Sequence, residues 1–189
     1  MEKESNLKEL LLPFSLTAFV VFLDQLTKAI IVHNWPRIGT FITDVFDNDL
    51  LILVHVRNKA IAFSIGDNLP DHLRFPLFVV VPILVLILLV WYYFKTTEFT
   101  RLQRWAIAGI IGGGIGNIAD RIFRPDGVVD FISVKFFGIF GMERWPTFNV
   151  ADSSVVICSI ILLVTILFPG KQEPAAETQA EAQIETQNE

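Results

Sequence analysis

The sequence contains one cysteine and three histidines, and this scarcity excludes two classes of protein. Cys158 has no partner cysteine, so a secreted domain held together by internal disulfides is excluded. His33, His55 and His72 lack the spacing of zinc ligands, and one cysteine cannot complete such a site. We therefore expect no bound metal and no other cofactor.

Basic residues are also few and form no patch. Charged residues make up 19% of the chain, and the formal net charge is −5. Most of that charge belongs to residues 170–189, which contain one lysine and five glutamates. On a helix these glutamates would repel one another at four-residue spacing, so we expect a disordered acidic tail. Without a basic patch, nucleic-acid binding is not expected.

What the chain has in excess is apolar sequence. Hydrophobic residues make up 52% of it, and the mean hydropathy is +0.53. They gather in four runs, each of which predicts a transmembrane helix because backbone polar groups in lipid need internal partners. The predicted helices cover residues 10–32, 75–94, 105–120 and 151–168. Pro82 should kink the second of them.

The first run resembles a signal peptide in its apolar centre, but the residues around it do not fit. No clean basic segment precedes it, and no small-residue cleavage site follows it. We therefore expect a retained helix and one transmembrane domain over residues 1–169. The connections contain two stretches rich in β-branched and aromatic residues, Leu50–Ser64 and Val128–Phe140, which predict short strands. The fold class is thus an all-α membrane protein with a small β-rich element.

The unusual polar residues all fall on one side of the membrane, because four consecutive helices alternate in direction. They lie at the end of the first and third helices, at the start of the fourth and in the two connections on that side. They are Asp24, Asn58, Asn117, Asp120, Arg121, Asp130, Asn149 and Asp152. Carboxylates near hydrocarbon are costly and usually mark function. Their convergence predicts a site.

Each of these residues also has a purely structural interpretation. Asp24 and Lys28 are four residues apart and would pair along a helix. Asn149 would cap the fourth helix, with Asp152 favoured by the helix dipole. Asp120 and Arg121 would form a charged helix end that reaches toward the headgroups, and Asp130 would be a hydrated loop residue.

The chemistry that this set best supports is that of an aspartic peptidase. When two carboxylates face each other, one retains its proton, so one can activate water while the other donates to a carbonyl oxygen. Asp130 and Asp152 fit best, because they flank the connection to the fourth helix. A Ser–Lys dyad of Lys135 with Ser64, Ser153 or Ser154 is a chemical rival. An ion or proton transporter that uses the clustered carboxylates is a further alternative.

Five motifs, in this order, resemble those of the lipoprotein signal peptidases (signal peptidase II). They are Asp24-Gln25-Leu26-Thr27-Lys28, Arg57-Asn58 with Ala62-Phe63-Ser64, Gly116-Asn117 with Asp120-Arg121, Val128-Val129-Asp130-Phe131, and Phe148-Asn149-Val150-Ala151-Asp152-Ser153. The match in order and spacing extends from about residue 10 to residue 168.

The resemblance implies an aspartic peptidase of the bacterial cytoplasmic (inner) membrane, with Asp130 and Asp152 as its catalytic pair. It implies substrates that are prolipoproteins carrying a diacylglyceryl group, cut just before the lipidated cysteine. It also implies that both termini are cytoplasmic, that the site lies near the outer face, and that the β-rich element belongs to the first outer loop. We further expect contact with membrane lipid and a monomeric protein.

The sequence departs from the family pattern after Asn58, where Ala60 and Ile61 replace a glycine and an alanine. This departure concerns the loop and substrate fit more than activity. The count of basic residues in the loops does not by itself decide the orientation, so the resemblance sets it. Which aspartate is the acid and which the base stays open.

Overall fold

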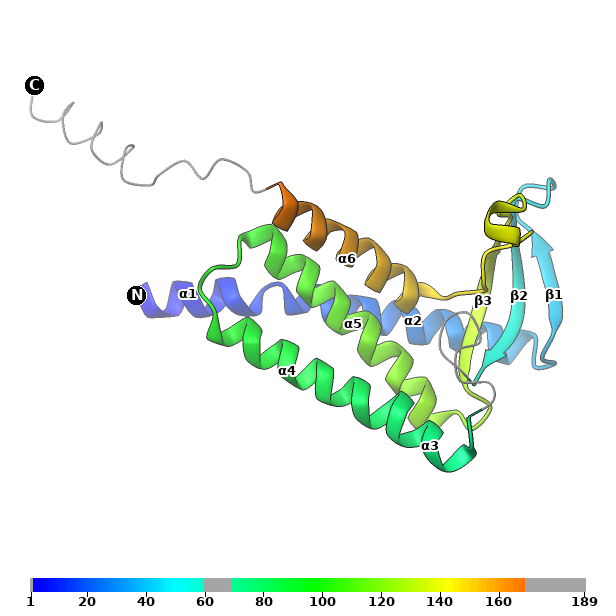
Figure 1. Cartoon of the computed structure of the whole chain (residues 1–189), viewed down its shortest axis with the longest axis horizontal. Coiled ribbons are helices and arrows are strands. Elements are labelled where there is room, and N and C mark those ends of the chain that lie inside the picture. Colours follow the sequence, from blue (N-terminus) through cyan, green and yellow to red (C-terminus); the bar gives the residue numbers. More distant parts are fainter. Residues whose placement is uncertain (1, 60–68, 169–189) are drawn as a thin grey trace, which may run out of the picture.

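The computed structural model describes residues 2–59 and 69–168, and its helices and strands alternate as the sequence predicts (Figure 1). The predicted acidic tail and the motif Ala62-Phe63-Ser64 lie outside the described residues. The elements, in chain order, are α1 (Glu2–Leu11), α2 (Phe14–Asn34), β1 (Thr40–Asp44), β2 (Leu51–Asn58), α3 (Asp71–Phe75), the π-helical turn η2 (Pro76–Val80), α4 (Val81–Lys95), α5 (Arg101–Phe123), β3 (Val128–Val134), the short 3-10 turn η3 (Ile139–Gly141) and α6 (Val150–Leu167).

Within residues 2–59 and 69–168, four helical stretches are long and apolar enough to cross a membrane, as the sequence predicts. They are Leu7–Asn34, His72–Lys95, Arg101–Phe123 and Val150–Leu167. The first begins earlier than predicted, because α1 precedes α2 and the two meet at Pro13. The third is longer at both ends, and the capping box of Thr100 and Gln103 fixes its start.

The second span is irregular close to the predicted kink at Pro82. Instead of a simple bend, the turn before it, η2, is π-helical from Pro76 to Val80. Pro82 has no backbone N–H, and its ring would collide with the carbonyl of Phe78 in a regular α-helix. A wider turn at this point accommodates that ring.

Helix α5 is the centre of the bundle. Half of the most apolar stretch of the span Arg101–Phe123 is buried, against 11% in the spans His72–Lys95 and Val150–Leu167. Its glycines permit close approach: a Cβ on Gly112 would lie 3.1 Å from the carbonyl oxygen of Thr17, and one on Gly116 would lie 2.7 Å from Oδ2 of Asp24. The glycine-rich stretch therefore serves helix packing.

A three-stranded antiparallel sheet in the order β1–β2–β3 covers one end of the bundle (Figure 1). Strands β1 and β2 come from the connection between α2 and α3, whereas β3 comes from the connection between α5 and α6. The β-rich element is therefore not confined to the first connection. Strands β2 and β3 lie within the two predicted stretches, and their register pairs Val56 with Asp130. The five-residue β1 is too short to show a clear pattern and was not predicted.

The sheet end of the bundle is also where α2 and α5 finish and where α3 and α6 begin (Figure 1). Residue 2 and the end of α6 lie at the opposite end. This arrangement follows from the alternating helices. It brings the polar motifs of three helices, α2, α5 and α6, and of two strands, β2 and β3, to one place.

Candidate active site

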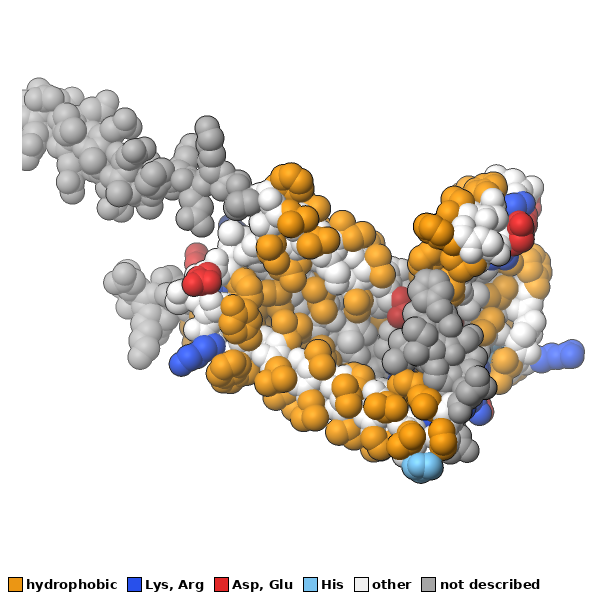
Figure 2. Space-filling model, viewed as in Figure 1, with side chains coloured by type: hydrophobic (Ala, Val, Ile, Leu, Met, Phe, Trp, Pro, Cys, Tyr) orange, Lys and Arg blue, Asp and Glu red, His pale blue; other side chains and the backbone are white. Residues whose placement is uncertain are grey.

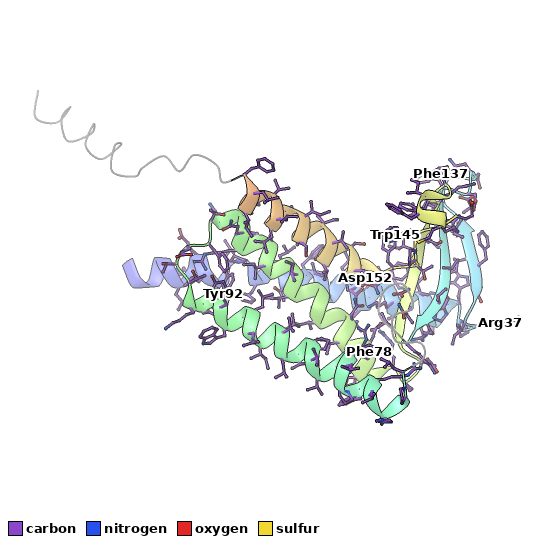
Figure 3. All side chains as sticks on the ribbon, viewed as in Figure 1. Arg37, Phe78, Tyr92, Phe137, Trp145 and Asp152 are labelled. Carbon is purple, nitrogen blue, oxygen red and sulfur yellow. The ribbon has the colours of Figure 1, made fainter. Side chains whose placement is uncertain are left out.

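The eight predicted site residues come together where the helices meet the sheet. Asp24 lies on α2, Asn58 at the end of β2, and Asp130 on β3; Asn117, Asp120 and Arg121 lie on the last turns of α5, Asn149 caps α6, and Asp152 is in its first turn. Figure 3 labels Asp152 at the sheet end of α6. Hydrogen bonds join these residues across five elements.

Asp130 is buried, with 2% of its surface exposed. Its Oδ1 accepts a hydrogen bond of 2.7 Å from Nδ2 of Asn149, and its Oδ2 accepts one of 3.1 Å from Nδ2 of Asn58. Both donors are neutral amides from other elements. Asp130 is therefore a fixed, water-poor carboxyl on a strand, not the hydrated loop residue of the structural interpretation.

Asp152 is half-buried at the third position of α6 and takes part in a capping box. Its Oδ2 accepts a 3.1 Å bond from the backbone nitrogen of Asn149, and its own nitrogen donates to Oδ1 of Asn149 at 2.9 Å. Its Oδ1 accepts a 2.7 Å bond from Nδ2 of Asn117. The capping interpretation is thus correct in geometry, and it also holds the Asp152 carboxyl beside Asp130.

Asn149 connects the two carboxyls. Its side-chain nitrogen donates to Asp130 and also to Oδ1 of Asn117 at 3.1 Å, while its backbone nitrogen donates to Asp152. None of its surface is exposed. One residue therefore sets the relative position of both carboxyls, whereas the sequence predicted Asn149 only as a helix cap and a motif position.

The surroundings of Asp130 favour its protonated form. Burial, followed by the nearby negative charge of Asp152, raises the pKa of Asp130 to about 7. The hydrogen bonds from Asn58 and Asn149 and the charge of Lys28 act in the opposite direction but do not cancel the rise. A carboxyl in this state can donate a proton near neutral pH.

A second, ion-paired group lies beneath this pair. Nζ of Lys28 lies 2.8 Å from Oδ2 of Asp24 and 3.1 Å from Oδ2 of Asp120, and it donates to Oδ1 of Asn117 at 3.0 Å. Lys28, Asp24 and Asp120 have no exposed surface. The Asp24–Lys28 helix pair considered from the sequence is present, but Lys28 also joins α2 to α5.

Gln25 completes this ion-paired group and was not among the predicted site residues. Its Nε2 lies 3.0 Å from Oδ2 of Asp24, 3.0 Å from Oδ1 of Asp120 and 3.1 Å from the carbonyl oxygen of Gly116. The signal was available, because a glutamine and a lysine inside an apolar helix are as unusual as an aspartate there.

The ion-paired group also fixes the elements that carry Asp130 and Asp152. Oδ2 of Asp120 accepts the backbone N–H of Val129 on β3 at 3.0 Å, and Arg124 pairs with its Oδ1. Oδ1 of Asp24 accepts the backbone N–H of Ala151 on α6 at 3.0 Å. The residues next to Asp130 and Asp152 in the chain are therefore bound to this group.

Arg121 lies at the edge of the site. Its guanidinium donates to the carbonyl oxygen of Asn117 at 3.4 Å, and the charges of Asp152, Asp130 and Asp120 act on it. With Asn58 it lines a cavity of about 260 Å³ that also contacts Phe75 and Phe78. Asn58, which donates to Asp130, connects the wall of this cavity to the carboxyl pair, and the wall is both polar and apolar.

Among the residues that the structure describes, no Ser–Lys dyad comes together. Nζ of Lys135 lies 3.2 Å from Asp49 at the edge of the sheet. Ser153 and Ser154 lie on α6 and donate to the carbonyl oxygens of Asn149 and Gly109, each at 2.9 Å. Ser64 lies outside the described residues. Within residues 2–59 and 69–168, no group of three metal-ligating side chains is arranged to hold an ion.

Comparison with known proteins gives one consistent family. The family model described as signal peptidase (SPase) II matches residues 16–168. A lipoprotein signal peptidase of Treponema denticola is 49% identical over 166 residues, covering 88% of this chain and 94% of that protein. One of Treponema pallidum is 44% identical over 172 residues, covering 91% and 90%. A solved bacterial membrane enzyme, determined by the in meso method at 2.3 Å resolution, matches with a TM-score of 0.69 and 31% identity, covering 85% of this chain and 92% of that one.

Proposed function

This chain belongs to the signal peptidase II family, and from that premise we propose that Asp130 and Asp152 are its catalytic pair. The protein is a multi-pass membrane peptidase that removes signal peptides from prolipoproteins. The transporter alternative has no support. The observation that carries the proposal is the placement of two carboxyls from different elements on one shared residue, Asn149.

The surroundings of the two carboxyls support different roles for them. Asp130 is almost fully buried among amide donors, so it holds the shared proton. Asp152 is half-buried at a helix N-terminus, where the helix dipole favours a negative charge. Asp152 is thus the general base and Asp130 the general acid in the resting enzyme. Their titration belongs to the pair and not to either group alone.

The reaction proceeds through water. Asp152 takes a proton from a water molecule as its oxygen attacks the carbonyl carbon of the scissile peptide bond, while Asp130 donates its proton to the carbonyl oxygen. When the tetrahedral intermediate collapses, the C–N bond breaks and the leaving amine takes the proton that Asp152 acquired. The proton on the former carbonyl oxygen returns to Asp130, so the resting state is restored.

The other polar residues position this pair. Asn58 and Asn149 orient Asp130, Asn117 and Asn149 orient Asp152, and Asp24 and Asp120 hold the neighbouring backbone. A network of this kind keeps its geometry when each polar group has a partner. Arg121, at the mouth of the cavity, contacts the substrate side of the site.

Substrates are prolipoproteins that carry a diacylglyceryl group, and the cut falls just before the lipidated cysteine. A lipidated precursor diffuses in the membrane and reaches the site laterally. Exposed apolar side chains on α4 and α6, such as Leu88 and Ile157, support this approach because they offer contact to lipid and to an apolar signal peptide (Figure 2). All proposed site residues come from one chain, which supports a monomer.

The enzyme resides in the bacterial cytoplasmic (inner) membrane, with both termini in the cytoplasm and the site near the outer face. Residue 2 and the end of α6 share the end of the bundle opposite the site, which supports a common side for both termini (Figure 1). Attack by a membrane-impermeant thiol reagent on Arg37→Cys in intact cells tests the orientation. If the introduced thiol reacts only after the cells are opened, the orientation is the opposite of the one proposed.

The catalytic assignment is tested with Asp130→Asn and Asp152→Asn in a gel-shift assay on a diacylglyceryl-modified precursor. General acid–base catalysis typically contributes 10²–10⁴-fold, so each variant should lose about 10³-fold or more in rate. Asp49→Asn is the matched control, because Asp49 is an exposed carboxylate at the sheet edge and should retain activity. Thermal transitions near that of the wild type show that the variants fold.

Cleavage at the wild-type rate by either folded asparagine variant would show that the pair is wrongly assigned. Activity that survives a strong chelator would agree with water activation by carboxylates. Loss of activity that zinc restores would instead place a metal in the mechanism.

A further inference from the structure

The far end of β3 carries exposed aromatic side chains that the site does not use. Residues 135–145, here named the aromatic tip, include Phe140 with 88% of its surface exposed and Phe137 with 67%. Ile139 and Trp145 in the same segment are also exposed. So much apolar surface on a small turn is unfavourable in water.

The backbone of the tip holds these rings outward. Phe137 and Phe140 have φ values of 55° and 54°, a conformation that bulky residues rarely adopt. Three hydrogen bonds keep the turn closed: Phe136 N–H to the carbonyl of Glu143 at 2.7 Å, Gly138 N–H to that of Met142 at 3.0 Å, and Met142 N–H to that of Ile139 at 3.1 Å. Such strain commonly marks a functional surface.

Two cations lie at the same end of the sheet, and one of them is over a ring of the tip: Nζ of Lys135 is 5.9 Å from the centre of the Phe137 ring. Nζ of Lys135 and Nη1 of Arg144 lie 3.2 Å and 2.9 Å from Asp49 on the β1–β2 connection. In Figure 2, apolar side chains cover the part of this end that faces the helices, and the charged ones lie on the part that faces away. The tip is therefore amphipathic, with its apolar side directed toward the level of the bundle.

A bilayer crossed by the four candidate spans would meet the surface of α6 near that level. Helix α6 begins at Val150, five residues after Trp145, and Val156 and Ile157 are already exposed on its surface. The tip extends sideways past α6 and not over the bundle core (Figure 1), and Trp145 lies on the side of β3 toward α6 (Figure 3). An amphipathic segment with aromatic rings and flanking cations suits the boundary between headgroups and acyl chains.

We propose that the aromatic tip inserts Phe137 and Phe140 into the interfacial region of the phospholipid leaflet next to α6. Lys135 and Arg144 lie above the rings at headgroup level. The tip joins the strand that carries Asp130 to the helix that carries Asp152, so this anchor fixes the height of the sheet relative to the helix. The contact requires only that the four spans cross a bilayer, and it does not depend on the catalytic assignment.

The test places a nitroxide spin label at Phe140→Cys in a Cys158→Ala background, reconstituted in vesicles of phosphatidylcholine and phosphatidylglycerol. Power saturation compares collisions of the label with oxygen, which partitions into lipid, and with a water-soluble nickel complex. Ile157→Cys is the lipid-facing control, and Arg37→Cys, on an exposed residue at the other edge of the sheet, is the water-facing control (Figure 3). Phe137→Cys replaces Phe140→Cys if the latter fails to fold, and cleavage of a lipidated precursor shows that each variant is folded.

We expect the ratio of oxygen to nickel collisions at residue 140 to be several-fold higher than at residue 37 and to approach that at residue 157. A ratio at residue 140 equal to that at residue 37 would overturn the proposal, because the tip would then lie in water. Protection from both reagents would also overturn it, since a second copy or another protein would then cover the tip.

Discussion

Two groups of aspartates lie side by side in this site and differ in what surrounds them. Asp24 and Asp120 share the ammonium group of Lys28, at 2.8 Å and 3.1 Å. Asp130 and Asp152, by contrast, accept their described hydrogen bonds from amides of asparagines and of the backbone. The first group has its charge balanced by a cation and serves to join helices. The second can share a proton, and it is therefore the one suited to chemistry.

The comparison teaches that burial alone does not identify a catalytic carboxylate in a membrane protein. Asp24 and Asp120 are as buried as Asp130. A buried ion pair is costly to desolvate, and it gives stability only when good geometry and further hydrogen bonds compensate for that cost. Gln25 and two backbone N–H groups supply those bonds here. Neutral donors around a buried pair instead leave a proton on it.

Removing the cation should make the two groups alike and should have the largest effect on stability. Lys28→Met removes the ammonium group that lies between Asp24 and Asp120, while Arg124 still pairs with Oδ1 of Asp120. Breaking a buried ion pair in this way typically costs 3–5 kcal/mol, so we expect a loss of about that size in the free energy of unfolding in detergent. Part of the lost stability should return at low pH, where protonation removes the repulsion between the two carboxylates.

Lys135→Met is the matched control for this change. Lys135 also pairs with an aspartate, but at the exposed edge of the sheet. Exposed pairs contribute about 0–1 kcal/mol, so this variant should stay close to the wild type. Equal stability losses in the two variants would contradict the distinction between a buried, ion-paired group and a surface pair.

The dependence of stability on pH tests the comparison between the two groups of aspartates through the protonation of Asp130. Its pKa is raised to about 7 in the folded protein by burial and by the charge of Asp152, whereas an unfolded aspartate titrates near 3.9. The folded state therefore binds the proton more tightly. The contribution of Asp130 protonation to the free energy of unfolding is complete below pH about 4. It falls as the pH rises toward about 7, by at most about 1.4 kcal/mol per pH unit, and it changes no further above that.

Asp130→Asn removes this titration, so the difference between the thermal transition temperatures of the wild type and the variant should change steadily between pH 4 and pH 7. The transition temperature of the wild type should fall relative to that of the variant as the pH rises. A constant difference across this range would show that Asp130 is ionised throughout and would contradict its raised pKa.

The sequence predicted the arrangement of this molecule better than its details. Four spans and two of the three strands follow from local patterns, because a membrane span and an alternating strand each need only neighbouring residues to be recognised. The π-helical turn before Pro82 and the five-residue β1 depend on contacts between elements, so they were not predicted.

The candidate site shows the same division. Helix alternation was enough to bring Asp130, Asp152 and their asparagine partners to one end, together with Asp24 and Asp120. The motif match marked the same residues. That Lys28 and Gln25 bind both Asp24 and Asp120 could not be derived, because it depends on how α2 is rotated against α5. The dual role of Asn149 likewise requires the fold of β3.

A smaller effect is expected where the ion-paired group meets the helix backbone. A Cβ on Gly116 would lie 2.7 Å from Oδ2 of Asp24, an oxygen already held by Lys28. Gly116→Ala should therefore displace that carboxylate and cost about 1–3 kcal/mol of stability, as overpacking typically does. Cleavage should fall with it, because Asp24 holds the start of α6.

Gly114→Ala is the control on the same helix. Its Cβ would meet Cδ2 of Leu86 at 2.9 Å, the far end of a flexible side chain that can move away. Thermal denaturation of both variants in one detergent gives the comparison. If Gly114→Ala proved as damaging as Gly116→Ala, close helix packing in general would be responsible, and not contact with the ion-paired group.

The smallest effect is expected from the two serines that follow Asp152. Ser153 donates to the carbonyl oxygen of Asn149 at the start of α6, and Ser154 donates to that of Gly109 on α5. Each hydroxyl is therefore bound to a backbone carbonyl, and neither belongs to the amide donors around the pair. Ser153→Ala and Ser154→Ala should each cost about 1 kcal/mol or less in stability, the net value of one hydrogen bond. The backbone N–H of Ser153 still binds the carbonyl of Asn149 when the hydroxyl is removed, so the start of α6 keeps its shape. Cleavage in the gel-shift assay should stay near the wild-type rate. Abolition of cleavage by either alanine, in a protein that still folds, would make a serine the nucleophile and would leave Asp152 as a helix cap alone.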